Sequence, residues 1–128
     1  MIVFEDDQTL AFLDHRPVFP GHCLLIPRQH LDSLVDVPPP LLAQLSANAR
    51  LLAIAVEKAL GAQGAFVAIN NRVSQSVSHV HVHVVPRTKG DGLKGFFWPR
   101  HKYRDPGHME DVRESLSRVL KALQNEEV

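Results

Sequence analysis

The chain has 128 residues, 45% of them hydrophobic and 22% charged, and its 14 lysines and arginines balance its 14 aspartates and glutamates. This composition is typical of one globular domain and argues against a disordered or membrane-spanning chain. A net charge of zero argues against binding along a nucleic-acid backbone. The single cysteine, Cys23, excludes an internal disulfide and a cysteine-based zinc site. The first residues show no signal-peptide pattern, so we expect one domain over residues 1–128, cytoplasmic and not bound to membranes.

The first half of the chain predicts three short strands and then a long helix. Brief apolar runs indicate strands over residues 2–4, 10–13 and 23–26, with polar or proline-rich turns between them. From Pro39 onward the apolar residues recur at three- and four-residue steps, which is the pattern of one helix face. Gly61 is suited to end this helix, because glycine readily adopts the left-handed conformation. The residues of the apolar face are Leu41, Leu45, Ala49, Leu52, Val56 and Leu60.

The second half predicts two more strands and a second amphipathic helix. The strands are expected over residues 65–70 and 80–85, around a polar loop over residues 71–78. The apolar positions of the helix are Met109, Val112, Leu116, Val119 and Leu123. Strands, helix, strands and helix in one small chain favour an α+β domain whose antiparallel sheet is covered on one side.

The segment over residues 79–85, HVHVHVV, raises the question of function. In an extended strand successive side chains point to opposite faces, so His79, His81 and His83 share one face and the valines between them share the other. A lone histidine would most often be a hydrogen-bonded polar residue on a half-exposed sheet. Three in strict alternation indicate a functional site, because histidine has no special preference for strands.

A metal site and a catalytic nucleophile are both compatible with this pattern. Histidines two apart on a strand can bind zinc, but the outer two lie about 13 Å apart along the strand, too far to share one ion. A third ligand would have to come from elsewhere, such as His22 or Cys23. A neutral imidazole is also a nucleophile near pH 7 that can attack phosphorus and form a covalent intermediate. His81 suits this role best, since a histidine on each side can orient substrate or protonate a leaving group.

The polar loop before the histidines adds hydrogen-bond donors for phosphate oxygens, in Gln75, Ser76 and Ser78. With these features the chain resembles the histidine triad (HIT) family of nucleotide hydrolases and transferases. The family signature, His-φ-His-φ-His-φ-φ with φ apolar, is met at every position of residues 79–85. Further family motifs match in order over residues 11–14, 20–22 and 25–30, at Asn70 and over residues 75–77. The resemblance covers about residues 3–87.

The resemblance implies a HIT-like fold, with a five-stranded antiparallel sheet, a long central helix and a C-terminal helix, paired into a homodimer with a continuous sheet. It implies cleavage at the α-phosphorus of a purine nucleotide conjugate through a nucleotidyl-histidine intermediate, with no cofactor and no metal. Mapped onto this chain, His81 would be the nucleophile. His83 and Ser76 would contact the phosphate or the leaving group, and His79 would position His81 or be held by His22.

The resemblance also implies a set of substrate-binding residues. Asp14 would bind the ribose hydroxyls, because a carboxylate can accept two hydrogen bonds. Asn70 would lie near ribose or phosphate, and Gln75 would contact the phosphate or the departing group. Phe12 and Leu13 are candidates for the base pocket, although an apolar residue at either position is at least as often part of the core.

Several alternatives remain open at this point. Hint-like members of the family cleave nucleoside phosphoramidates, and Ser76 favours them because a serine can assist departure of an amine. Fhit-like members cleave dinucleoside polyphosphates, and residues 16–18 and the long C-terminal helix are more similar to theirs. A nucleotide-binding sensor with little turnover and a metal-dependent hydrolase are the alternatives from other classes. The pair Trp98-Pro99 either reaches a partner subunit's site or packs on its own core.

Overall fold

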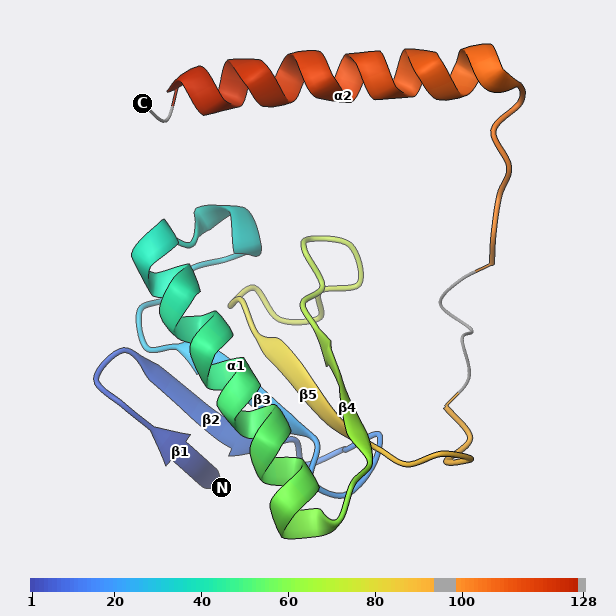
Figure 1. Ribbon diagram of the computed structural model, residues 1–128. Helices are drawn as coiled ribbons and strands as arrows, with labels where there is room; N and C mark the ends of the chain where they lie inside the picture. Colours follow the sequence, from blue (N-terminus) through green and yellow to red (C-terminus); the bar gives the residue numbers. More distant parts are fainter. Residues whose placement is uncertain (94–98, 127–128) are drawn as a thin grey trace. The chain divides into compact units, whose positions relative to one another are not determined.

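The computed structural model describes residues 1–93 and 99–126, and within them it contains one sheet, two long helices and a short 3-10 helix. The strands are β1 (Ile2–Glu5), β2 (Thr9–Leu13), β3 (Cys23–Pro27), β4 (Gly64–Ala68) and β5 (Val82–Arg87). They form a five-stranded antiparallel sheet in the order β1-β2-β3-β5-β4 (Figure 1). The helices are η1 (Leu34–Asp36), α1 (Pro39–Leu60) and α2 (Pro106–Glu126). The predicted α+β, HIT-like fold is confirmed.

The chain divides into two compact units, residues 1–91 and residues 92–128. The first unit holds the sheet and α1, and the second holds α2. Helix α2 has the predicted amphipathic pattern, but none of its described residues is buried, and Leu116 is 59% exposed. A single domain over residues 1–128 therefore stays a prediction. Trp98 lies outside the described residues, so a role for Trp98-Pro99 stays a prediction as well.

Helix α1 begins and ends where the local sequence favours a start and a stop. Pro39 occupies its first position, where a missing N–H costs no helical hydrogen bond. Gly61 follows the last residue with φ 70°, in the left-handed region, and its N–H donates to the Glu57 carbonyl at 3.0 Å. Within the described residues, no helix is long and apolar enough to cross a membrane.

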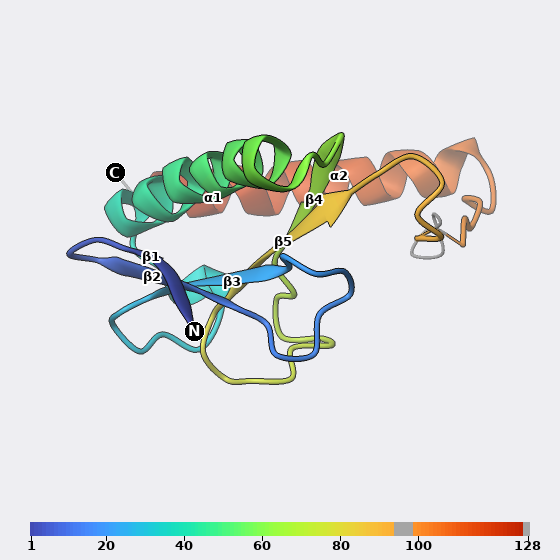
Figure 2. The same ribbon diagram turned by 90° about the horizontal axis from the view of Figure 1, so that it is seen from below.

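The apolar face of α1 covers one side of the sheet, and the hydrophobic core lies between them (Figure 2). The sheet contributes every second residue of its strands, and Ala11, Leu25 and Val84 are fully buried there. Leu45 is the most deeply buried residue of α1, at 2% exposure. Alternation in the strands and the 3.6-residue period of the helix thus place these residues in one layer.

A small polar network lies beside this apolar layer, built around the buried Asn48 and Thr9. Asn48 of α1 is buried and donates to the Asp6 carboxylate and to the Thr9 hydroxyl, both at 2.8 Å. Asp6 also accepts from the Gln8 and Thr9 amides, at 3.0 and 2.7 Å. Burial alone would raise the pKa of Asp6, but these hydrogen bonds outweigh it and hold the pKa well below its usual range. The network fastens the β1–β2 turn to α1.

Two strands have bounds that differ from the sequence prediction. Strand β4 ends at Ala68 instead of residue 70, and β5 covers Val82–Arg87 instead of residues 80–85, although the apolar alternation begins at Val80. The register pairs Leu25 with Val82, so continued pairing would set Val80 against Pro27, which has no N–H to donate. The N–H of Val80 instead donates to the carbonyl of Leu31 at 2.8 Å. His81 therefore lies just ahead of the strand, and His79 lies in the bend that precedes it.

Candidate active site

The histidines lie on the face of the sheet that α1 leaves uncovered. Val80, Val82 and Val84 are buried, at 1%, 4% and 0% exposure, whereas His81 and His83 between them are half-buried. Figure 2 shows the segments that join β2 to β3 and β4 to β5 on the side of the sheet away from α1. The alternation predicted for the segment persists, even though only His83 is part of the strand.

The strand register shows which side chains neighbour His83 on its face of the sheet. His83 pairs with Leu24 on β3 and with Ala68 on β4, and Leu24 pairs with Phe12 on β2. Directly paired residues point to the same face, so Phe12, Leu24 and Ala68 form one row with His83. Phe12 lies two strands from His83, about 10 Å across the sheet. An apolar floor next to an imidazole suits a flat aromatic base.

Leu13 lies on the opposite face, contrary to its assignment to the base pocket. Its neighbour Phe12 faces the histidines, and the alternation of β2 turns Leu13 toward α1. There it packs against the core and lines an apolar cavity of about 510 Å³ together with Phe4, Leu52 and Val56. In this structure Leu13 is a core residue, the alternative that the sequence left open.

His81 is held by a backbone carbonyl that defines its reactive atom. Its Nδ1 lies 2.8 Å from the carbonyl oxygen of His79. A carbonyl can only accept, so Nδ1 carries the proton and a neutral His81 has its lone pair on Nε2. The rings of His81 and His83 lie edge to face, with centroids 5.0 Å apart. His81 thus has the tautomer of a nucleophile, beside a second imidazole.

His79 is anchored at the end of β3. Its Nε2 lies 3.0 Å from the carbonyl oxygen of Pro27, and its ring centroid is 5.0 Å from that of His30. His30 in turn contacts the Asp32 carboxylate at 3.0 Å. The backbone carbonyl of His79 accepts the hydrogen bond from His81, which corresponds to the expectation that His79 positions His81. The other arrangement, in which His22 holds His79, does not occur, because His22 contacts His83.

His22 is almost fully buried, at 4% exposure, and its Nε2 lies 2.9 Å from Nδ1 of His83. Its Nδ1 accepts a hydrogen bond from the Val18 amide at 3.2 Å and lies 3.8 Å from the Asp14 carboxylate. Burial lowers the pKa of His22, and Asp14 opposes this only in part. Burial also lowers the pKa of His83, His81 and His22 lower it further, and Asp14 again opposes. Both rings are therefore biased toward the neutral form.

The other predicted site residues, Ser76, Asn70 and Gln75, lie in or next to the loop that precedes the histidines. Ser76 and Asn70 are exposed, and Asn70 lies two residues beyond Ala68, the partner of His83. The Gln75 side chain accepts from the Arg72 amide at 2.9 Å and donates to the carbonyls of Val77 and Asp32. As placed, Gln75 orders the loop ahead of the histidines instead of reaching toward a phosphate.

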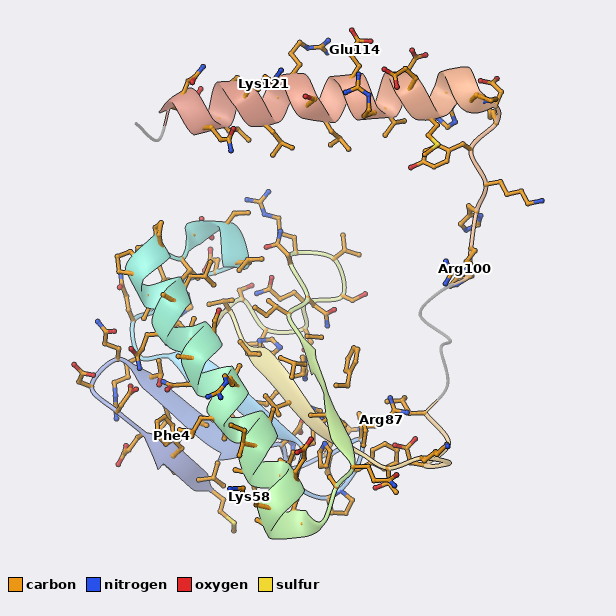
Figure 3. All side chains as sticks on the ribbon, in the orientation of Figure 1. Phe4, Lys58, Arg87, Arg100, Glu114 and Lys121 are labelled. Atoms are coloured by element: carbon orange, nitrogen blue, oxygen red, sulfur yellow. The ribbon has the colours of Figure 1, made fainter. Side chains whose placement is uncertain are left out.

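Sequence reasoning gave no role to His30 or to the Val18 amide. His30 stands within a matched family motif, which was the available signal, whereas a backbone N–H leaves no trace in a residue pattern. Arg87 is the last residue of β5 (Figure 3), whereas His83 is near the start of that strand, and Arg87 is paired with Asp91 at 2.6 Å. Over the described ranges, no group of three or more histidine, cysteine, aspartate or glutamate residues has the arrangement of a metal site.

Comparison with known proteins agrees with this geometry. A family model described as the HIT domain matches residues 1–90. The chain is 34% identical over 123 residues to an uncharacterised HIT-like protein of Saccharolobus solfataricus, covering 94% of this chain and 88% of that protein. A crystal structure of a HIT family protein from Bacillus subtilis has a TM-score of 0.80 and 31% identity, covering 91% of this chain and 85% of that one.

Two relatives have names that state an activity. The chain is 34% identical over 93 residues to an adenylylsulfatase of Arabidopsis thaliana, covering 71% of this chain and 47% of that protein. It is 34% identical over 92 residues to an asymmetrical bis(5'-nucleosyl)-tetraphosphatase of Schizosaccharomyces pombe, covering 70% of this chain and 50% of that protein. The matches thus span about half the length of these two relatives. With the HIT domain model matched over most of its length, the chain belongs to the histidine triad family.

Proposed function

We propose that this protein is a nucleotide hydrolase or nucleotidyl transferase that cleaves at the α-phosphorus of a purine nucleotide conjugate. The observation that carries the proposal is the hydrogen bond of 2.8 Å from Nδ1 of His81 to the carbonyl of His79, which leaves the Nε2 lone pair for attack. The adenylylsulfatase and the tetraphosphatase among the relatives support a nucleotide substrate.

The first step is nucleophilic displacement at phosphorus. The lone pair on Nε2 of His81 forms a bond to the α-phosphorus while the bond from phosphorus to the leaving group breaks. The imidazole becomes positively charged, and the His79 carbonyl that accepts its Nδ1 proton stabilises that charge. The leaving group departs with the bonding electron pair and takes a proton from water, while a ring N–H of the neighbouring neutral His83 donates a hydrogen bond to the departing atom.

The second step returns His81 to its starting state. A water molecule attacks the phosphorus of the nucleotidyl-histidine, the bond from phosphorus to Nε2 breaks, and a nucleoside monophosphate leaves. The proton released by the attacking water passes to the solvent, which balances the proton that the leaving group took up in the first step. A second nucleophile in place of water would make the same intermediate a nucleotidyl donor.

Other residues of this face bind the substrate. Phe12 and Leu24 offer the base an apolar floor beside His83. Asp14 accepts the ribose hydroxyls with the oxygen that the Arg16 amide leaves open, since that amide donates to Oδ1 at 2.9 Å. Ser76, exposed in the loop ahead of the histidines, donates to the departing atom. Its hydroxyl suits the amine of a phosphoramidate, and a dinucleoside polyphosphate is the competing substrate class.

The experiment that tests this proposal is the intact mass of the protein after a brief reaction and acid-free quench. Adenosine phosphoramidate and a diadenosine polyphosphate serve as donors, with His81→Ala as the matched variant. A transient gain of one adenylate in the wild type and none in the variant is expected, and the donor that labels faster identifies the substrate class. Measurable adenylate binding without adduct or turnover from either donor would instead support a nucleotide sensor. Loss of activity on addition of a chelator would support a metal-dependent hydrolase.

We also propose that the protein acts as a homodimer in the cytoplasm. Strand β4 is an edge strand, and Val67 on it is 46% exposed beside an apolar hollow of about 420 Å³ formed with α1. Pairing of two such edges would cover both. Val67→Arg is expected to give monomers in sedimentation. Val3→Arg, on the opposite edge strand β1 and 47% exposed, is the control that leaves the dimer intact.

A further inference from the structure

The buried His22 lies between a backbone donor and a second imidazole. The Val18 amide is 3.2 Å from Nδ1 of His22, and Nδ1 of His83 is 2.9 Å from Nε2 of the same ring. An amide N–H can donate but cannot accept, so Nδ1 of His22 must provide a lone pair. The proton of a neutral His22 is therefore on Nε2.

This assignment passes on to His83. The Nε2–H of His22 points at Nδ1 of His83, so Nδ1 of His83 accepts and its own proton is on Nε2. His81 has the opposite tautomer, because its Nδ1 faces the carbonyl of His79. Two histidines two residues apart thus differ at their outer nitrogens: one has a lone pair and the other has a proton. In each case a backbone group makes the choice.

We propose that Val18 is a positioning residue whose backbone N–H sets, through His22, the tautomer in which His83 presents a hydrogen-bond donor to the substrate. The inference rests on the proposed function, because a donor at His83 matters only if His81 attacks phosphorus next to it. Val18 exposes 52% of its surface, so it is the amide of this residue and not its side chain that carries the role.

Asp14 acts against this arrangement. Its Oδ2 lies 3.8 Å from Nδ1 of His22, where it favours a proton on that nitrogen and raises the pKa of both His22 and His83. The titratable groups that act on the pair formed by His22 and His83 are Asp14 and His81. Without the Val18 N–H, Asp14 would draw the proton of His22 to Nδ1. Nε2 of His22 would then accept from Nδ1–H of His83, and His83 would lose its outward proton.

The loop between β2 and β3 holds the amide in place. The Asp14 amide donates to the His22 carbonyl at 2.9 Å, and the His22 amide donates to the Phe19 carbonyl at 3.0 Å. These two bonds close residues 14–22 on themselves, with the Val18 N–H turned inward. Gly21 within this loop has φ 99° and lies so close to Leu60 that a β-carbon there would be 2.3 Å from its Cδ1. The loop is thus fixed from both sides.

The direct test is the tautomer of each histidine in the wild-type protein. Long-range proton–nitrogen correlation spectra of ¹⁵N-labelled protein near pH 7.5 separate Nδ1–H from Nε2–H rings, and single His→Gln variants assign the signals. Nε2–H is expected for His22 and His83, and Nδ1–H for His81. A His22 or His83 signal of the Nδ1–H type would overturn the proposal, and this measurement needs no change at Val18.

A second test removes the N–H alone. Val18→Pro lacks the donor, whereas Val18→Ala keeps it and loses most of the side chain. In Val18→Pro the His22 and His83 signals are expected to change to the Nδ1–H type, with the rate of adduct formation lower by about tenfold or more and a smaller change in KM. In Val18→Ala both signals are expected to match the wild type. A folded Val18→Pro protein with wild-type tautomers would overturn the role of the amide.

Failure of this inference and failure of the proposed function are distinguishable. The spectra report proton positions without any substrate, whereas the mass of the adduct reports chemistry at His81. Wild-type tautomers as expected, with no adduct from either donor, would retain the Val18 role as a structural feature and reject the enzyme. An adduct at His81 with a wild-type Nδ1–H tautomer at His83 would keep the enzyme and reject the Val18 role.

Discussion

The two faces of residues 79–85, the segment that leads into β5, differ in the burial and in the polarity of their side chains. Toward α1 the segment presents Val80, Val82 and Val84, which are almost completely buried in the core. Away from α1 it presents His81 and His83, half-buried and held by polar partners. Because neighbouring side chains in a strand point to opposite sides, residues 79–85 contribute both to the hydrophobic core and to the candidate active site.

This difference implies that substitutions on the two faces have different consequences. A change on the valine face removes buried apolar surface and lowers the free energy of unfolding. A change on the histidine face removes a hydrogen-bonding or nucleophilic atom that the core does not need.

Replacing His81 by alanine is expected to lower turnover of adenosine phosphoramidate by about 10⁴-fold or more, because it removes the attacking atom. The free energy of unfolding is expected to change by less than about 0.5 kcal/mol, because His81 lies outside the core and is half-buried. Steady-state kinetics and urea denaturation on the same preparation measure both quantities. A loss of less than tenfold in turnover would remove His81 from the mechanism.

Replacing Leu25 by alanine is expected to lower the free energy of unfolding by about 2–5 kcal/mol, because Leu25 is fully buried and leaves a cavity. Turnover per folded molecule is expected to stay near the wild-type value. Leu24→Ala is the matched control on the other face, where Leu24 pairs with His83, and there KM is expected to change more than stability. Equal losses of stability in the two variants would contradict the expected difference between the two faces of the sheet.

Replacing Asn48 by alanine is expected to cost about 1–3 kcal/mol of unfolding free energy, because Asp6 and Thr9 lose a shared donor. The pKa of Asp6 is lowered from 3.8 in the folded state, so its contribution is complete above pH 3.8 and is lost as the pH falls through the folded-state pKa. The variant should therefore lose less stability on acidification than the wild type does. Urea denaturation at neutral and acid pH measures both effects.

Acidification is expected to lower the free energy of unfolding through the histidines His22 and His83. The pKa values of His22 and His83 are lowered from 6.5, so the unfolded chain binds protons at these positions that the folded chain does not. Stability therefore falls as the pH drops below 6.5, and the loss is complete only below the folded-state pKa values. A His22→Gln variant should show a shallower dependence on pH in the same denaturation series. A wild type equally stable at pH values of about 5 and 7.5 would contradict this expectation.

Replacing Ser76 by alanine is expected to have the smallest effect, a three- to tenfold lower rate (roughly one hydrogen bond) with adenosine phosphoramidate. Ser76 is exposed and assists only the departing group, so stability should not change. The rate with a diadenosine polyphosphate serves as the internal control. A larger loss with the polyphosphate than with the phosphoramidate would assign Ser76 to the other leaving group.

Local patterns in the sequence predicted much of this architecture. The strands, the long helix ended by Gly61 and the opposite faces of the histidines and valines follow from periods of 2 and 3.6 residues, which a few neighbouring residues are enough to define. Asn48 also stood within the apolar face of α1, between Leu45 and Leu52, but its partners Asp6 and Thr9 are about forty residues away in the chain.

The tertiary structure decided the contacts that complete the site. Pairing across the sheet placed Pro27 where it ends the ladder and brought His22 to His83 instead of His79. The packing of α1 on the sheet decided which face of β2 is buried, and so made Leu13 a core residue. It also brought the Val18 amide to His22. Alternation along one strand is local, whereas register is set by the sum of many contacts between strands, and backbone donors and acceptors have no residue type by which a sequence could reveal them.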